Sequence, residues 1–566
     1  MLPVLALVIG LTSACRTEPT MTAATPQTRA EQTAYEETSR YDEVRMFIDA
    51  LARQTPRVRV EVFGTSEEGR DLPLIVVRDP PSFAPAARSS RQPVVLVMAN
   101  IHAGEVEGKE AALHLARRLT LGDLQPLLPS AVWLFAPIYN ADGNEKISLD
   151  NRVEQNGPIG GVGTRENANG LDLNRDFMKL ESSEARGLVA LFTKWDPDVI
   201  VDLHTTNGSY HGYHLTYGPP LNANTDPRIA AFAHDQLLPT VRQAMQERHG
   251  FRTFDYGNFT TADAMDDELE GFKSGETRQK VWRTFDARPR FGTNYAGIRN
   301  RIAILSEAYS YLDFKGRVTV TEAFTEEIMR FVAANGDAIR SLTSSADTEW
   351  IDETHARALG IASALQSLPK PVDVLVGAIG STVNPRSGKS MRTMIESTAI
   401  PTSMIVYDRF VSTASRRVPA EYIVPASANG LHEEVERKLR DHGIQVERLE
   451  KASRMPLERL TLTDVRHAEQ AFQGHHPTSI KGTFERRESD VPAGSLVIPT
   501  KQPLGRLVFY LLEPESDDGL TTWNFLDSAL KVGASHPVLK STPSPTRVVR
   551  RRPKRPSQPA TGRDRR

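Results

Sequence analysis

Cysteine is almost absent from this chain: among 566 residues, Cys15 is the only one. An intramolecular disulfide and a cluster of thiolate ligands are both excluded, because each needs at least two thiols. A cysteine nucleophile is likewise excluded from the body of the chain. Any metal site must therefore be built from histidine and carboxylate side chains.

The chain also lacks an excess of either charge, with 69 Lys and Arg residues against 71 Asp and Glu residues. No basic surplus favours a nucleic-acid partner, and we expect none. Hydrophobic residues make up 39% and charged residues 25%, which is typical of a soluble globular protein. A chain of this length can bury more than one core.

One apolar stretch opens the chain, "MLPVLALVIGLTSAC", and it is too short to cross a membrane as a helix. Its end resembles the lipobox of bacterial lipoproteins, with Thr12 where leucine is usual. The resemblance implies that residues 1–15 are a signal peptide, that Cys15 is lipidated, and that the protein is exported to the cell envelope or periplasm. One acyl chain anchors a protein only weakly, so several are implied. The alternative is an ordinary secretory signal with an incidental cysteine.

Residues 16–35 are rich in Thr, Ala, Glu and Gln without periodicity, which predicts a flexible tether. Apolar residues at helical spacing predict a helix over 41–52, and alternating stretches at 58–64 and 72–77 predict a β-hairpin. Apolar runs then alternate with helical patterns, which predicts an α/β fold with a partly parallel sheet. These runs lie at residues 93–98, 131–138, 198–203 and 302–307.

A shift toward Ser, Thr, Ala and Asp at residues 341–348 predicts a boundary between two domains. We expect a first domain over 36–340 and a C-terminal accessory domain of mixed class over 349–540. Residues 541–566 are Pro-rich and basic, which predicts a disordered tail. Within the accessory domain, the pattern predicts strands at 372–379, 495–500 and 506–512 and a helix at 431–443.

Four of the predicted strands end in polar residues. His102 and Glu105 follow the first, "YNADGN" the second, His204 the third, and Glu307 ends the fourth. Ligands of open α/β sheets bind beyond the carboxyl ends of the strands, so we expect these side chains at one edge. Two histidines and one carboxylate form a common catalytic zinc set, which leaves a coordination position for water. His102 and Glu105 lie on one short turn and can converge on one ion.

Asn174 and Arg175 follow the alternating "LDL" and are predicted near the same edge. Arginine is suited to bidentate binding of a carboxylate. The alternative is that Arg175 forms a surface ion pair with Asp172 or Asp176.

Taken in order, six segments resemble the M14 zinc carboxypeptidases of the carboxypeptidase A type, over roughly residues 40–335. They are "VFGTSEEGRDLPLIVV", "NIHAGEVEGKEA", "YNADGN", "GLDLNRDF", "VDLHT" and "IAILSEAYSY". The resemblance implies a central mixed eight-stranded sheet flanked by helices, one zinc ion (Zn2+) per chain and a peptide substrate with a free C-terminal carboxylate. It also implies these roles: His102, Glu105 and His204 as zinc ligands, Asn174 and Arg175 as the carboxylate-binding pair, and Glu307 as the catalytic base.

Family members stabilise the oxyanion with an arginine upstream of the Asn-Arg pair. Here Arg165 is the preferred counterpart and Arg152 the alternative. The family's mobile tyrosine has no clear counterpart, because Phe285 stands near its place and Tyr295 is too close to Glu307. Arg288 or Arg290 is a candidate for lining the substrate cleft. His211 and His214 are spaced so that they could bind a metal, but a structural or substrate-side role is preferred for them.

The predicted function is therefore a zinc metallocarboxypeptidase of the cell envelope, in which glutamate serves as general base for metal-activated water. A cell-wall peptide amidase of the same fold is one alternative. A non-catalytic lipoprotein that binds peptides or cell-wall polymer is another.

Overall fold

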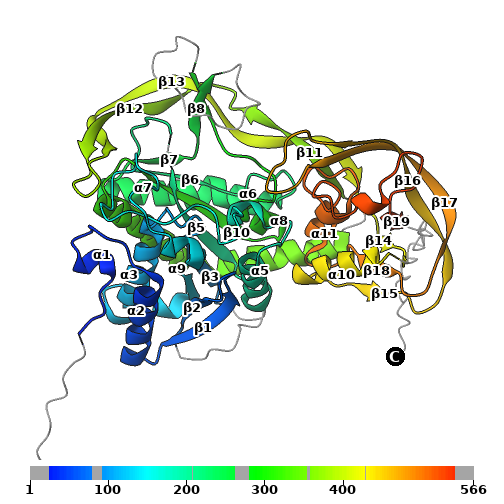
Figure 1. Ribbon diagram of the computed structural model, residues 1–566, viewed down its shortest axis with the longest axis horizontal. Helices are drawn as coiled ribbons and strands as arrows, with labels where there is room; N and C mark the ends of the chain where they lie inside the picture. Colours follow the sequence, from blue (N-terminus) through cyan, green and yellow to red (C-terminus); the bar gives the residue numbers. More distant parts are fainter. Residues whose placement is uncertain are drawn as a thin grey trace, which may run out of the picture.

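The computed structural model describes residues 24–79, 92–206, 208–261, 280–353, 357–427 and 429–541. Its centre is an eight-stranded mixed sheet with the order β1-β2-β4-β3-β5-β10-β6-β7 (Figure 1). The predicted eight-stranded mixed sheet is thereby confirmed. Its strands are β1 (Val58–Thr65), β2 (Asp71–Val77), β3 (Val94–Ala99), β4 (Val132–Ala136), β5 (Val199–Thr206), β6 (Leu215–Gly218), β7 (Thr253–Asp255) and β10 (Ile302–Tyr309).

The four central strands β4, β3, β5 and β10 run parallel, so their carboxyl ends meet at one edge. The hairpin of β1 and β2 is antiparallel, as predicted. Every residue of β3, β4 and β5 is buried, which requires cover on both faces of the sheet.

Helices provide this cover. On one face α3 (Glu107–Leu121), α7 (Leu238–His249) and the long α9 (Phe314–Glu353) pack together. A second group holds α5 (Ser183–Trp195) and α8 (Gly292–Ile298), which meet through Phe192 and Tyr295. The other helices of this half are α1 (Arg29–Gln32), α2 (Tyr41–Gln54), α4 (Ala141–Glu145) and α6 (Pro227–Ala231).

A second sheet of five strands combines segments from both predicted domains. Strands β8 (Asn258–Thr261) and β9 (Lys280–Arg283) belong to the first, and β11 (Ala358–Ser367), β12 (Val372–Val383) and β13 (Ser390–Arg417) to the second. Parallel pairing of β9 with β13 joins the two groups. The sheet arches over one side of the molecule (Figure 1). Near the start of β13, Arg392 Nη2 contacts Glu154 Oε1 at 2.7 Å, which ties the arch to the loop that carries Arg152.

The third sheet has six strands in the order β15-β18-β14-β19-β16-β17. They are β14 (Glu421–Val424), β15 (Glu447–Arg448), β16 (Ser453–His467), β17 (Thr478–Val491), β18 (Leu496–Pro499) and β19 (Leu539–Ser541). The predicted helix at 431–443 is α10 (Leu431–Asp441). The strand predicted at 506–512 is wrong, because these residues form the helix α11 (Gly505–Leu512). All of α11 is buried, and apart from Arg506 its sequence is an almost continuous apolar run, which has no period that separates helix from strand.

The boundary predicted at residues 341–348 is not found there. Helix α9 continues through these residues to Glu353, with one non-helical position at Asn335. Beyond them, the buried indole of Trp350 donates a hydrogen bond to the carbonyl of Thr500 in the third sheet's half, at 3.0 Å. One hydrophobic core extends from the central sheet to β14, β18 and α11. The two predicted domains therefore share one hydrophobic core.

The predicted tether over 16–35 is partly wrong. Residues 28–35 include α1, whose N-terminus is stabilised by a capping box between Thr28 and Glu31. Glu31 also pairs with Arg117 of α3 at 2.6 Å, so this segment is attached to the first half. Cys15, the signal peptide and nearly all of the basic tail lie outside the described residues. Within the described part of the chain, no helix is both long and apolar enough to span a membrane.

Candidate metal centre

The turn after β3 places the first two site residues. Asn100 has a φ of 65°, a left-handed conformation that asparagine tolerates, and the chain reverses there toward His102 and Glu105. Helix α3 begins at Glu107 and packs tightly on β5. A Cβ on Gly108 would lie 2.7 Å from the Cβ of Leu203, so only glycine permits this approach. The close contact brings Glu105 to the end of β5.

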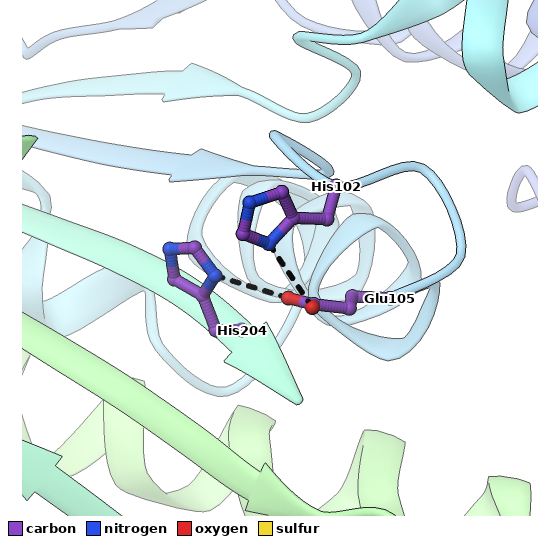
Figure 2. A group of neighbouring side chains, drawn as sticks. All are labelled: His102, Glu105 and His204. Carbon is purple, nitrogen blue, oxygen red and sulfur yellow. Dashed lines mark hydrogen bonds and ion pairs between the residues drawn. The ribbon is translucent and has the colours of Figure 1, made fainter. Parts of the chain in front are cut away.

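His102, Glu105 and His204 converge in a buried cluster (Figure 2). His102 Nδ1 lies 3.0 Å from Glu105 Oε1, and His204 Nδ1 lies 3.0 Å from Glu105 Oε2. One ligand atom from each residue lies within 4.8 Å of the other two. Three predicted ligands from two distant parts of the chain are therefore brought together.

Aspartates hold the far sides of both imidazoles. Asp172 Oδ1 lies 3.0 Å from His102 Nε2, and Asp202 Oδ2 lies 3.0 Å from His204 Nε2. A carboxylate that accepts the Nε2 hydrogen fixes the tautomer of a metal-binding histidine and leaves its Nδ1 lone pair for the ion, as Asp172 does for His102. Asp202 approaches His204 as an ion pair only. With an ion bound, Nδ1 of each histidine and the carboxylate of Glu105 would face it together. The donor set therefore fits a zinc ion.

Charge in the cluster points the same way. Burial alone would raise the pKa of Glu105, but His102, Arg152 and His204 outweigh it and hold that pKa well below its ordinary value. Burial would lower the pKa of His204, whereas the carboxylates of Asp202 and Glu105 raise it well above the ordinary value. The protein thus concentrates negative charge around the two imidazoles, which a divalent cation would neutralise.

Glu307 lies beside this cluster. In the parallel pairing of β10 with β5, Glu307 is the partner of His204. The residue as a whole is half-buried, and the loss of water around its carboxyl raises the pKa of that group. The nearby carboxylate of Glu105 adds to this rise, while His204 and Arg165 oppose it. A carboxyl group with a raised pKa is a better proton acceptor than an ordinary one.

Both arginine candidates reach the cluster. Arg152 Nη2 lies 2.7 Å from Glu105 Oε1, and Arg165 Nη1 lies 3.9 Å from the same oxygen. Arg165 is also bound to Asp172 through Nη2 at 2.8 Å. The geometry leaves open which of them faces the reacting carbonyl.

Asn174 and Arg175 follow directly on Asp172, in the short helix η2 (Leu173–Arg175). Asp172 caps this helix by accepting the N–H of Asn174 at 2.9 Å. The Asn174 amide oxygen accepts the N–H of Gly292 at 3.0 Å. The Arg175 guanidinium lies 4.0 Å from the centre of the Phe291 ring and 3.9 Å from Asp172, so the ion pair considered for it is present but long.

Comparison with known proteins identifies the chemistry. Residues 44–254 match the family model of the M14 peptidases, described as zinc carboxypeptidase. Carboxypeptidase 2 of Trichophyton rubrum is 21% identical over 514 residues, which cover 87% of this chain and 85% of the relative. Carboxypeptidase Z of Mus musculus is 34% identical over 149 residues, 25% of this chain and 22% of that protein. The matched segment is similar to the zinc carboxypeptidases of this family.

The chain is accordingly a metallocarboxypeptidase, a hydrolase. Among solved structures, the metallo-carboxypeptidase from Burkholderia cenocepacia is similar, with 16% identity and a TM-score of 0.37 over 52% of this chain and 69% of that chain.

The other sequence candidates of this metallocarboxypeptidase have structural partners. His211 accepts the N–H of Tyr213, and its ring lies against Tyr309. His214 contacts Glu396 of β13 at 3.1 Å. Tyr295 is buried and shares its hydroxyl with His442. The remaining pairs are Arg288 with Asp286 and Arg290 with Asp518.

Tyr256 is a residue that the sequence did not single out. Its ring contacts the ring of Phe285, with centroids 5.7 Å apart. Burial raises the pKa of the Tyr256 hydroxyl, and the charge of Glu307 raises it further. Residues 257–306 separate Tyr256 from Glu307 in sequence, so spacing to the glutamate gave no signal for it.

Proposed function

We propose that this metallocarboxypeptidase removes C-terminal residues from peptides, with zinc bound by His102, Glu105 and His204 and with Glu307 as general base. The observation that carries the proposal is the pairing of Glu307 with His204 across two neighbouring strands. When bound, zinc supplies Lewis acidity that polarises a carbonyl and acidifies water.

Each nearby side chain has a separate task in this proposal. Glu307 accepts a proton from the attacking water and passes it to the leaving amine. Arg165, or Arg152 in its place, faces the negative charge that develops on the carbonyl oxygen. The guanidinium of Arg175 and the amide of Asn174 hold the terminal carboxylate, so cleavage is limited to the last peptide bond.

Paired peptides test this function. The purified protein is given peptides with a free C-terminus and the same peptides with an amidated C-terminus, with and without a chelator. We expect stepwise loss of terminal residues from the free peptides alone, abolished by the chelator and visible by mass spectrometry. Cleavage of muropeptides in preference to these peptides would instead favour a cell-wall amidase.

We also propose that the enzyme is exported and held at the cell envelope through lipid on Cys15. Support comes from the sequence "LTSAC" alone. Fractionation of cells that express the Cys15→Ser variant tests this: we expect the variant to leave the membrane fraction. Equal membrane association of both proteins would exclude the lipid anchor.

A further inference from the structure

A tight turn in the C-terminal half reaches the metal centre. At residues 472–475, Phe472 and His475 exchange both backbone hydrogen bonds, at 2.7 and 3.0 Å. Between them Gln473 has a φ of 51° and Gly474 a φ of 80°. Positive φ at both central positions is typical of a type I′ turn, whose first position favours Asn, Asp or Gly. Glutamine is therefore an unfavourable choice for this backbone, and its side chain must have another use.

That use is a contact across 301 positions of sequence. The side-chain oxygen Oε1 of Gln473 accepts the backbone N–H of Asp172 at 3.1 Å. Asp172 in turn contacts three groups of the centre: it holds His102 Nε2, caps Asn174, and binds the guanidinium of Arg165. A single backbone position thus orients a zinc ligand, the carboxylate-binding helix and an arginine. Gln473 fixes that position.

The turn itself is firmly held. His475 Nε2 contacts Glu181 Oε1 at 2.9 Å, and the Phe472 ring packs on Trp523. Arg290 lies over the rings of both aromatic residues and pairs with Asp518 at 2.8 Å. With its flanks fixed in this way, the turn presents Gln473 to Asp172 in one orientation.

We propose that Gln473 is a positioning residue of the zinc site, through which the C-terminal half completes the metal centre. The inference rests on the proposed function, because it takes His102 as a zinc ligand. Gln473 acts through Asp172. Without the side-chain oxygen of Gln473, the Asp172 N–H loses its partner, and the carboxylate that orients His102 is held less firmly. Groups that orient metal-binding histidines typically change metal affinity by about 10–100-fold. Gln473 lies one contact further out, so we expect about 3–10-fold.

Substitution of Gln473 separates this role from a merely structural one. Asparagine and glycine both suit the left-handed backbone better than glutamine, but neither reaches Asp172. The variants Gln473→Asn and Gln473→Gly should therefore keep or raise the melting temperature of the metal-free protein. Both should nevertheless release zinc more readily, measured by competition with a chromogenic chelator. They should also lower kcat with little change in KM.

A matched control is available at Gln502. Its Oε1 also accepts a backbone N–H, from Gln445 at 2.8 Å, but within the third sheet's half. Gln502→Asn should lower the melting temperature and leave zinc affinity unchanged.

The outcomes distinguish the two proposals. If the unaltered protein binds zinc and Gln473→Asn binds it equally tightly, the role of Gln473 is excluded and the proposed function stands. If the unaltered protein binds no zinc, the proposed function fails and the inference fails with it. If the Gln473 variants lose both melting temperature in the metal-free form and zinc affinity, Gln473 is only a structural residue.

Discussion

Glu307 and His204 occupy facing positions in the ladder between β10 and β5. Neighbouring strands lie about 4.8 Å apart, so this register alone sets the spacing between the proposed base and a metal ligand. A shift of one residue would turn the Glu307 side chain to the opposite face of the sheet. The pairing of two buried strands therefore determines the geometry of the reaction centre.

Replacing the proposed base is the most direct test. Glu307→Gln keeps the size of the side chain but removes its proton affinity, so hydrolysis should fall by about 10²–10⁴-fold. Zinc content, measured on the purified variant, should remain that of the unaltered protein, because Glu307 is not a ligand. Hydrolysis at the original rate would exclude Glu307 as the base.

Metal removal should abolish activity and lower stability. A ligand that binds only the folded state stabilises it by about 2.7 kcal/mol at a hundredfold excess over its Kd. We expect the melting temperature to fall on treatment with a chelator and to recover with zinc. Magnesium serves as the control, because a His and Glu donor set does not suit it. Full hydrolysis in the chelated protein would contradict a zinc mechanism.

Two arginine variants decide which guanidinium stabilises the oxyanion. Loss of one such donor typically lowers kcat by about 10²–10³-fold. We expect this loss in Arg165→Met and a smaller effect in Arg152→Met, with KM nearly unchanged. Zinc affinity must be measured in both, since Arg165 binds Asp172 and Arg152 binds Glu105. If the large loss occurs in Arg152→Met instead, the role belongs to Arg152.

Arg175→Lys keeps the positive charge but loses the planar fork that binds a carboxylate through two hydrogen bonds. Hydrogen bonds to charged groups contribute about 1.5–3 kcal/mol, so kcat/KM for peptides with a free terminus should fall by about 10–100-fold. The loss should appear mainly in KM. Any slow cleavage of amidated peptides should be unaffected, and an equal loss on both substrates would argue against carboxylate recognition by Arg175.

Stability should depend on pH through His114, which lies buried on α3. Burial would lower the pKa of His114, but contacts with Glu31 at 3.5 Å and Glu322 at 3.2 Å outweigh it and raise the pKa to about 9. The unfolded value is about 6.5, so this contribution is fully present below pH ~6.5 and is lost as pH rises through about 9. Its size is on the order of 3 kcal/mol.

Urea unfolding of the His114→Gln variant checks this prediction. The difference in free energy of unfolding between the two proteins should be largest near pH 6 and should shrink toward pH 10. A difference that does not change with pH would mean that His114 is neutral in the folded protein.

The central fold could be predicted because buried parallel strands leave a clear mark in sequence. The runs that became β3 and β4 are apolar at every position and the one that became β5 is largely so, since both faces of these strands are covered. The same mark misleads at α11, where a continuous apolar run from Leu507 to Leu512 is helical. Ser, Thr, Ala and Asp at 341–348 resembled a linker, yet tertiary packing of α9 overrides that weak local preference.

The candidate site shows the same division. His102 and Glu105 could be predicted because they are three positions apart on one short turn, which brings both side chains to the same place. Asp202 could have been found as well, since alternate residues share a face of a strand and His204 lies two positions later. Gln473 could not, because no local pattern indicates a contact with a residue 301 positions away. Such long-range contacts depend on packing that a single sequence does not display.

Helix α9 runs from the half that contains the central sheet to the half that contains the third sheet. This limits how the enzyme could be shortened. A protein cut within α9 would keep every proposed zinc ligand and the base. It would also leave β9 without its neighbour β13 and expose a core that both halves share. The stretch that carries the chemistry is thus much shorter than the stretch that must fold, and an attempt to isolate the catalytic segment should yield aggregated protein.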